Sequence, residues 1–173
     1  QGGVTDGADR ERITLRQGDG LTAVAPGEVE VAVFSGLAEK KIWSLLCDGA
    51  AIVGSMKRLV FGPLTSLGYL RPRLRELGWR TVDENLVCTG GHYTLSFAVE
   101  PGTEPDFEPM TWHFGPLLFE RQEPLLAAYL QDIRRRHHKA FEHVTRQRPG
   151  FRELIEHWPA AMARCSTWPG APR

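Results

Sequence analysis

A nearly continuous apolar run, Val29–Phe34, is the feature that most constrains the fold of this chain. Such a run is typical of a strand that is covered on both faces, whereas a strand with one wet face alternates. Ser35-Gly36 ends the run, and Ala38–Val53 then carries apolar residues at helical spacing. Arg58–Phe61 is a second short apolar strand. A strand, a helix and a strand in this order predict a parallel pair joined by a crossover.

The same periodicities predict the remaining elements. The further strands that we expect are Ile13–Leu15, Trp79–Thr89 and Tyr93–Val99, the last two joined at Gly90-Gly91 as a β-hairpin. The further helices that we expect are Leu64–Leu77, Pro124–His143 and Phe151–Trp158, with an irregular tail after Pro159. We therefore predict a doubly wound α/β fold, with a partial α/β domain in residues 1–103 and a helical extension in residues 104–173.

The charge balance argues against a general attraction to nucleic acid. Lys and Arg number 21, as do Asp and Glu, so the net charge is zero. From Arg134 to the end, however, nine Lys or Arg stand against three Asp or Glu. This basic segment is either a solvated helix face or a contact with nucleic-acid phosphate.

Cysteine content and hydropathy exclude several other classes of protein. Three cysteines without a CxxC spacing favour neither a disulfide framework nor a zinc site, and they indicate a reducing compartment, cytoplasmic or organellar. No apolar run approaches the roughly 18 residues of a membrane span, and no signal peptide is recognisable. The chain begins with Gln rather than Met, which leaves open a targeting segment upstream.

Two glycine-centred turns are candidate parts of a cofactor site. In Gly18-Asp19-Gly20, the Asp19 carboxylate would accept a hydrogen bond from the amino group of a bound adenine; the alternative is an ordinary turn aspartate. Ser35-Gly36 would let a cofactor approach the backbone closely, and the alternative is a plain strand-to-helix turn. Together they could line an adenosine-containing cofactor.

Nine segments in a consistent order resemble one protein family. They are Gly7–Arg10, Ile13–Leu21, Gly27–Gly36, Arg58–Pro63, Leu74–Trp79, Val82–Val87, Tyr93–Pro101, Phe114–Leu118 and Pro124–Leu130. Through them the chain resembles the bacterial TrmK family, which methylates an adenine N1 at tRNA position twenty-two. The resemblance implies a Rossmann-like methyltransferase fold with C-terminal helices, S-adenosylmethionine as cofactor and tRNA as partner. It leaves the oligomeric state open.

The chain also departs from the family pattern. The family's first strand, with the Asp- and Gly-containing loop that holds the methionine part of the cofactor, has no counterpart, and neither has its second strand. The family's Ala-Gly-Met-Gly-Gly reads Ser35-Gly36-Leu37-Ala38-Glu39. We therefore expect an N-terminally incomplete methyltransferase fold, with Val29–Phe34 as an exposed, aggregation-prone apolar edge. We expect this chain alone to be inactive, whether it is a fragment or a degenerate member. The alternative is a non-catalytic paralogue that binds RNA or protein.

Two further segments are candidates for binding the substrate. The family's Gln-Pro-Asn reads Gly62-Pro63-Leu64, which would border the target-base pocket or simply end the strand. Arg134 and Arg135 would contact tRNA phosphate, unless they belong to a solvated helix face. His137-His138 does not indicate a metal, because adjacent helical side chains point roughly 100° apart. No catalytic residue can be assigned, since adenine N1 methylation needs mainly positioning and proton loss.

Overall fold

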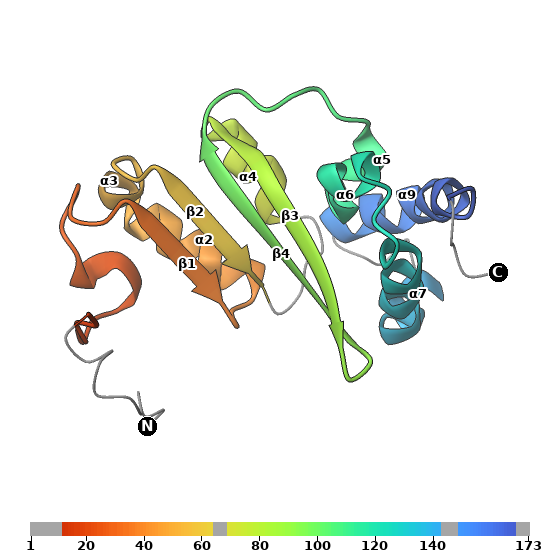
Figure 1. The fold of residues 1–173 in the computed structure, drawn as a ribbon, viewed down its shortest axis with the longest axis horizontal. Coiled ribbons are helices and arrows are strands. Elements are labelled where there is room, and N and C mark those ends of the chain that lie inside the picture. Colours follow the sequence, from red (N-terminus) through yellow and green to blue (C-terminus); the bar gives the residue numbers. More distant parts are fainter. Residues whose placement is uncertain (1–11, 64–68, 143–148, 169–173) are drawn as a thin grey trace.

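The centre of the protein is a four-stranded sheet. The computed structural model describes residues 12–63, 69–142 and 149–168. The strands are β1 (Val31–Ser35), β2 (Arg58–Gly62), β3 (Trp79–Thr89) and β4 (His92–Pro101), in the spatial order β1-β2-β4-β3. β1 runs parallel to β2, and β4 runs antiparallel to both β2 and β3 (Figure 1). The predicted crossover and hairpin are both confirmed.

Three helices pack on one face of the sheet. They are α2 (Glu39–Asp48), α3 (Ala50–Val53) and α4 (Leu70–Glu76). The predicted Ala38–Val53 helix is interrupted at Gly49, where a Cβ would come within 2.7 Å of Leu21 Cδ1. The core between these helices and the sheet contains Phe34, Ile42, Leu45, Leu46, Val53, Met56, Leu59, Phe61, Leu70, Leu74, Trp79, Phe97 and Val99.

The opposite face of β1 is bare, which corrects one prediction. Val31 and Val33 are 49% and 70% exposed, whereas Phe34, on the helix side, is buried. The apolar run is therefore a strand, as predicted, but it is not covered on both faces, because α2 to α4 lie on one side only. In the described part of the chain β1 is an edge strand, so the predicted exposed apolar edge is confirmed.

The strand expected at Ile13–Leu15 is wrong. These residues have no regular structure, and Leu15 is 86% exposed. An isolated strand satisfies none of its backbone groups within the protein, and none of the described strands pairs with these residues. Hydropathy alone does not report whether a partner strand exists.

The C-terminal helices form a second core with the hairpin. They are α5 (Pro109–Phe114), α6 (Pro116–Glu120), α7 (Leu126–Arg136), α8 (His138–Glu142) and α9 (Pro149–Cys165) (Figure 1). The buried residues of this core are Leu86, Leu95, Phe114, Leu118, Phe119, Leu126, Ala127, Tyr129, Leu130, Ile133, Leu154, Ile155, Ala161 and Cys165. Because Leu86 and Leu95 come from β3 and β4, the helices share a core with the sheet. The boundary at residue 103 stays a prediction.

Helix α9 is longer than predicted. The irregular tail expected after Pro159 is wrong, because the helix continues to Cys165. Pro159 lies on the exposed side, while Ile155, Ala161 and Cys165 remain buried on the other. Packing of that buried stripe outweighs the cost of a proline inside a helix, about 3 kcal/mol. The predicted helix Pro124–His143 corresponds to α7 and α8, which divide at His137.

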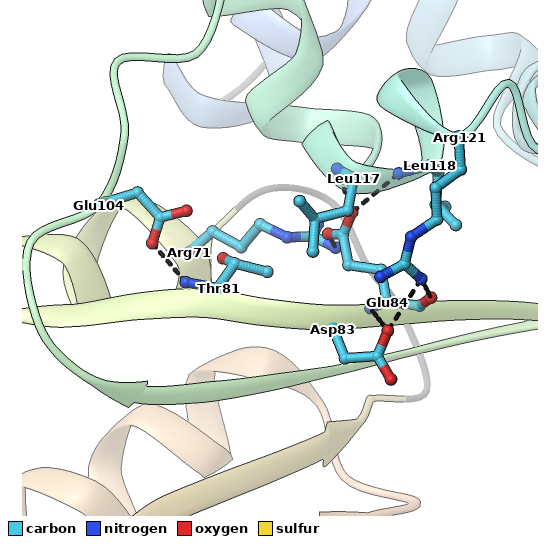
Figure 2. Close-up of polar contacts among 8 residues, drawn as sticks. All are labelled: Arg71, Thr81, Asp83, Glu84, Glu104, Leu117, Leu118 and Arg121. Atoms are coloured by element: carbon cyan, nitrogen blue, oxygen red, sulfur yellow. Dashed lines mark hydrogen bonds and ion pairs between the residues drawn. The ribbon is translucent and has the colours of Figure 1, made fainter.

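A buried ion pair joins the sheet to both groups of helices. Arg71 Nη2 of α4 donates to Glu84 Oε1 of β3 at 2.6 Å, and the two side chains are 1% and 0% exposed (Figure 2). Glu84 Oε2 accepts hydrogen bonds from the backbone N–H groups of Leu117 (2.8 Å) and Leu118 (3.2 Å), at the start of α6. One carboxylate thus binds α4 and α6 to the same strand.

A β-bulge brings a second, exposed contact beside this pair. The register of β3 against β4 shifts between Thr81 and Asp83, so Asp83 faces solvent while its neighbour Glu84 faces the interior. Arg121, just after α6, donates to Asp83 Oδ1 at 2.8 Å and to the Glu84 carbonyl oxygen at 3.2 Å (Figure 2). The exposed and the buried pair therefore connect the same elements.

These two pairs predict different losses of stability. Glu84→Ala leaves the Arg71 guanidinium buried without its carboxylate, so we expect the free energy of unfolding to fall by about 3–5 kcal/mol. Asp83→Ala removes an exposed partner, 62% accessible, and we expect a loss below about 1 kcal/mol. Urea unfolding of both variants measures the difference. Equal losses would contradict the conclusion that Glu84 is the residue that holds α4 and α6 on β3.

A buried histidine predicts a pH dependence. His113 of α5 is 6% exposed and stacks on His157 of α9, with ring centroids 5.8 Å apart. Burial, assisted by the nearby His157 and Arg71 charges, lowers the pKa of His113 from 6.5 to about 4. The unfolded chain thus takes up this proton at higher pH than the folded chain. We expect stability that is full above pH 6.5 to fall, by up to about 3 kcal/mol, as the pH drops toward 4.

The His113→Phe variant isolates this effect. It retains an aromatic ring for packing but has no proton to gain. In urea unfolding at neutral pH and near about pH 5, the variant should lose less stability than the wild type. Parallel losses in the two proteins would show that other groups, such as carboxylates, cause the acid sensitivity.

Candidate functional site

The carboxyl ends of β1 and β2 bring two predicted segments together. The Gly36 N–H donates to the Gly62 carbonyl oxygen at 3.0 Å, and a Cβ on Gly62 would come within 3.3 Å of Ser35 Oγ. Gly36 has φ +72° and open space where a Cβ would point, so the turn there requires glycine and leaves room beside the backbone. This edge of an open α/β sheet is where ligands bind. Pro63 follows directly and is buried, and Leu64 lies outside the described residues.

The third predicted segment lies against α2. Asp19 precedes the short 3-10 helix η1 (Gly20–Ala23), and Gly20 approaches α2 so closely that a Cβ there would overlap Leu45 Cδ2. The Asp19 carboxylate is 86% exposed and lies 3.8 Å from Lys41 Nζ, in the first turn of α2. Gly18-Asp19-Gly20 is therefore positioned by α2, the helix that begins beside Ser35-Gly36. Its contact with a cofactor stays a prediction.

A cluster that the sequence did not reveal lies beside this edge. Glu39, the first residue of α2, is 4% exposed, and its carboxylate accepts a hydrogen bond from the Tyr69 N–H at 3.2 Å. The Arg73 guanidinium lies 3.7 Å from the Tyr69 ring centroid, and Lys40 Nζ lies 5.7 Å from it. Tyr69 and Arg73 are four residues apart, a spacing that could have indicated their contact. Nothing local indicated Lys40, which comes from another helix.

The chemistry of this edge suits a polar or anionic ligand. Ser35 offers a hydroxyl group, the turn at Gly36 exposes backbone, and Lys40 and Arg73 offer positive charge. Glu39 is turned into the protein toward the start of α4. The arrangement can bind and orient a ligand, and it assigns no general base.

The two predicted substrate-binding arginines lie on the exposed side of α7. The Arg134 guanidinium stacks on the Trp158 ring of α9, 4.7 Å from its centroid. Arg135 and Arg136 both bind Asp132, at 2.6 Å and 2.7 Å. Arg134 thus links α7 to α9, whereas the two pairs with Asp132 lie within α7. None of these side chains is brought to the carboxyl ends of β1 and β2. Their contact with tRNA stays a prediction.

Other kinds of site were also sought. Among the residues that the structure describes, no group of three or more His, Cys, Asp or Glu side chains could hold a metal ion. The three cysteines are free, with Cys165 buried. None of the described helices has the length and apolar character needed to cross a membrane.

Comparisons with known proteins point to one family. The family model of TrmK, tRNA (adenine(22)-N(1))-methyltransferase, matches residues 1–156. A search of curated proteins found no match.

Several solved structures share the fold. Streptococcus pneumoniae Sp1610 in complex with S-adenosyl-L-methionine is 22% identical with a TM-score of 0.69, over 84% of this chain and 66% of that one. The B. subtilis m1A22 tRNA methyltransferase TrmK is 18% identical with a TM-score of 0.65, over 87% of this chain and 68% of that one. M. capricolum TrmK in complex with S-adenosyl-homocysteine is 15% identical with a TM-score of 0.65, over 86% of this chain and 67% of that one. The chain thus spans about two thirds of the length of these proteins, and the Rossmann-like fold is confirmed.

Proposed function

The chain belongs to the TrmK family of tRNA (adenine(22)-N(1))-methyltransferases, and on that premise we propose that the carboxyl ends of β1 and β2 form part of a site for S-adenosylmethionine and a tRNA adenine. The observation that carries the proposal is the hydrogen bond from Gly36 N–H to the Gly62 carbonyl oxygen. It holds the predicted cofactor turn beside the segment predicted to border the target base.

The turn at Ser35-Gly36 fits the cofactor. The space beside the Gly36 backbone is open, and the positive φ of this residue keeps a side chain out of it. When bound, S-adenosylmethionine would supply the electrophilic methyl group that the adenine N1 lone pair attacks. The part of this chain is to hold the two reactants in line, with Asp19 toward the cofactor adenine and Gly62-Pro63-Leu64 toward the target base.

We propose that residues 1–173 alone bind the cofactor weakly and do not catalyse methyl transfer. Within residues 12–30 no strand precedes β1, so the described chain provides no loop for the methionine end of the cofactor. The buried carboxylate of Glu39 replaces a family glycine in the same turn. Both features weaken the pocket while leaving the fold intact.

Calorimetry with S-adenosylmethionine and a methyl-transfer assay on unmodified tRNA test this proposal. We expect no micromolar binding and no methylated adenine from this chain. B. subtilis TrmK under the same conditions is the positive control for the reagents. Micromolar binding or methyl transfer by residues 1–173 would contradict the proposal that the site is incomplete.

A non-catalytic paralogue that binds RNA or protein is the second candidate. It is favoured by Glu39, whose carboxylate is turned inward to the Tyr69 N–H, and by the absence in Gly62-Pro63-Leu64 of polar side chains that could orient a base. Its signature would be binding of unmodified tRNA or of a protein with an affinity that S-adenosylmethionine does not alter. We place either form in a reducing compartment, cytoplasmic or organellar, because Cys47 and Cys88 are free and exposed.

A further inference from the structure

Most positive side chains of this neutral chain already have a carboxylate partner. In the described residues, Arg58 and Arg80 share Glu100, Arg121 binds Asp83, and Arg135 and Arg136 share Asp132. Further pairs are Arg16–Glu28, Lys41–Asp19, Lys57–Glu30, Arg71–Glu84, Arg75–Asp106 and Arg164–Glu108. The surface charge is thus largely neutralised within the protein.

Lys40 and Arg73, beside the carboxyl ends of β1 and β2, are exceptions to this pairing with carboxylates. Within residues 12–63, 69–142 and 149–168, neither forms an ion pair with a carboxylate. Both instead lie against the half-buried Tyr69 ring, Arg73 at 3.7 Å and Lys40 at 5.7 Å from its centroid. Arg73 is fixed further, because its Nη1 donates to the Tyr69 carbonyl oxygen at 2.8 Å.

The carboxylate of Glu39, which precedes Lys40 in α2, is turned away from the surface. Glu39 is 4% exposed and accepts a hydrogen bond from the Tyr69 N–H, so its carboxylate points into the protein toward the Tyr69 backbone. Two positive groups held by one aromatic ring, with the negative group turned inward, leave a local excess of positive charge on the surface. Such a surface attracts phosphate, and an ordered guanidinium binds it with defined geometry.

We propose that Lys40 and Arg73, oriented by Tyr69, bind a backbone phosphate of the RNA that presents its base to the β1–β2 edge. The proposal rests on the proposed function for the choice of RNA as the ligand. Lys40 of α2 and Arg73 of α4 lie outside the nine segments through which the chain resembles the family. Tyr69 is a positioning residue in this scheme, since the Arg73 guanidinium already covers its ring.

A salt titration of RNA binding tests the proposal. The double variant Lys40→Ala/Arg73→Ala is compared with the wild type by fluorescence anisotropy on an unmodified tRNA transcript. Each lost phosphate contact should lower the slope of log K against log salt by about 1, and binding should weaken several-fold at low salt. The single variant Lys40→Ala removes an exposed charge that makes no hydrogen bond in the described chain, so it keeps the test valid if Arg73→Ala unfolds the protein.

Lys57→Ala/Arg80→Ala is the matched control. It removes two charges near the amino ends of β2 and β3, away from the carboxyl ends of β1 and β2. This variant should leave the slope of log K against log salt unchanged. A wild type that binds tRNA while the Lys40 and Arg73 variants keep its affinity and slope overturns this inference alone. A wild type with no salt-dependent binding of tRNA overturns the proposed RNA substrate and this inference with it.

Discussion

The buried pair between Arg71 and Glu84 is the interaction on which the rest of the structure depends. Removing two charges from water costs several kcal/mol for each, and this cost is offset only where geometry and further hydrogen bonds are good. Here Glu84 gains two backbone N–H donors from α6, and the Arg71 guanidinium lies 4.4 Å from the Phe97 ring centroid. Because the donors come from α4 and α6 and the acceptor from β3, the pair requires α4, the hairpin and α6 to be in place together.

The same pair fixes the orientation of the helix that carries the candidate site. With Arg71 directed inward to β3, Tyr69 contacts Lys40 and Glu39 of α2, and Arg73 stacks on the Tyr69 ring. The candidate ligand edge is therefore supported from the interior of the protein. The contacts that order this edge lie between α2 and α4 and between the ends of β1 and β2.

Local pattern predicted the elements, and tertiary context decided what covers them. The parallel strand pair, the crossover and the hairpin follow from periodicity and from the glycines that end each run. Val31 and Val33 look buried by composition but are exposed, because burial depends on neighbours that a local pattern does not contain. Pro159 suggested a helix end, yet packing of Ala161 and Cys165 extends α9 past it.

The candidate site likewise contains features that the sequence predicted and features that only the structure reveals. The turn at Ser35-Gly36 and the strand end at Gly62 were predictable, since parallel strands end at one edge. The partners of Tyr69 were not, because Lys40 lies 29 positions earlier and meets it only through the packing of α2 against α4. The inward orientation of Glu84 likewise depends on the bulge in β3, which shifts the alternation of the strand and is not encoded in a local pattern.

The central claim is that the carboxyl ends of β1 and β2 form the ligand-binding edge of this chain. A two-dimensional NMR titration of the amide groups with millimolar S-adenosylmethionine tests it most directly, because this method detects binding too weak for calorimetry. The account predicts that the largest shifts occur at the Gly36, Lys40 and Gly62 amides, with little change at Arg134 and Arg135 on α7. Largest shifts on α7, or no shift at Gly36 and Gly62, would contradict it.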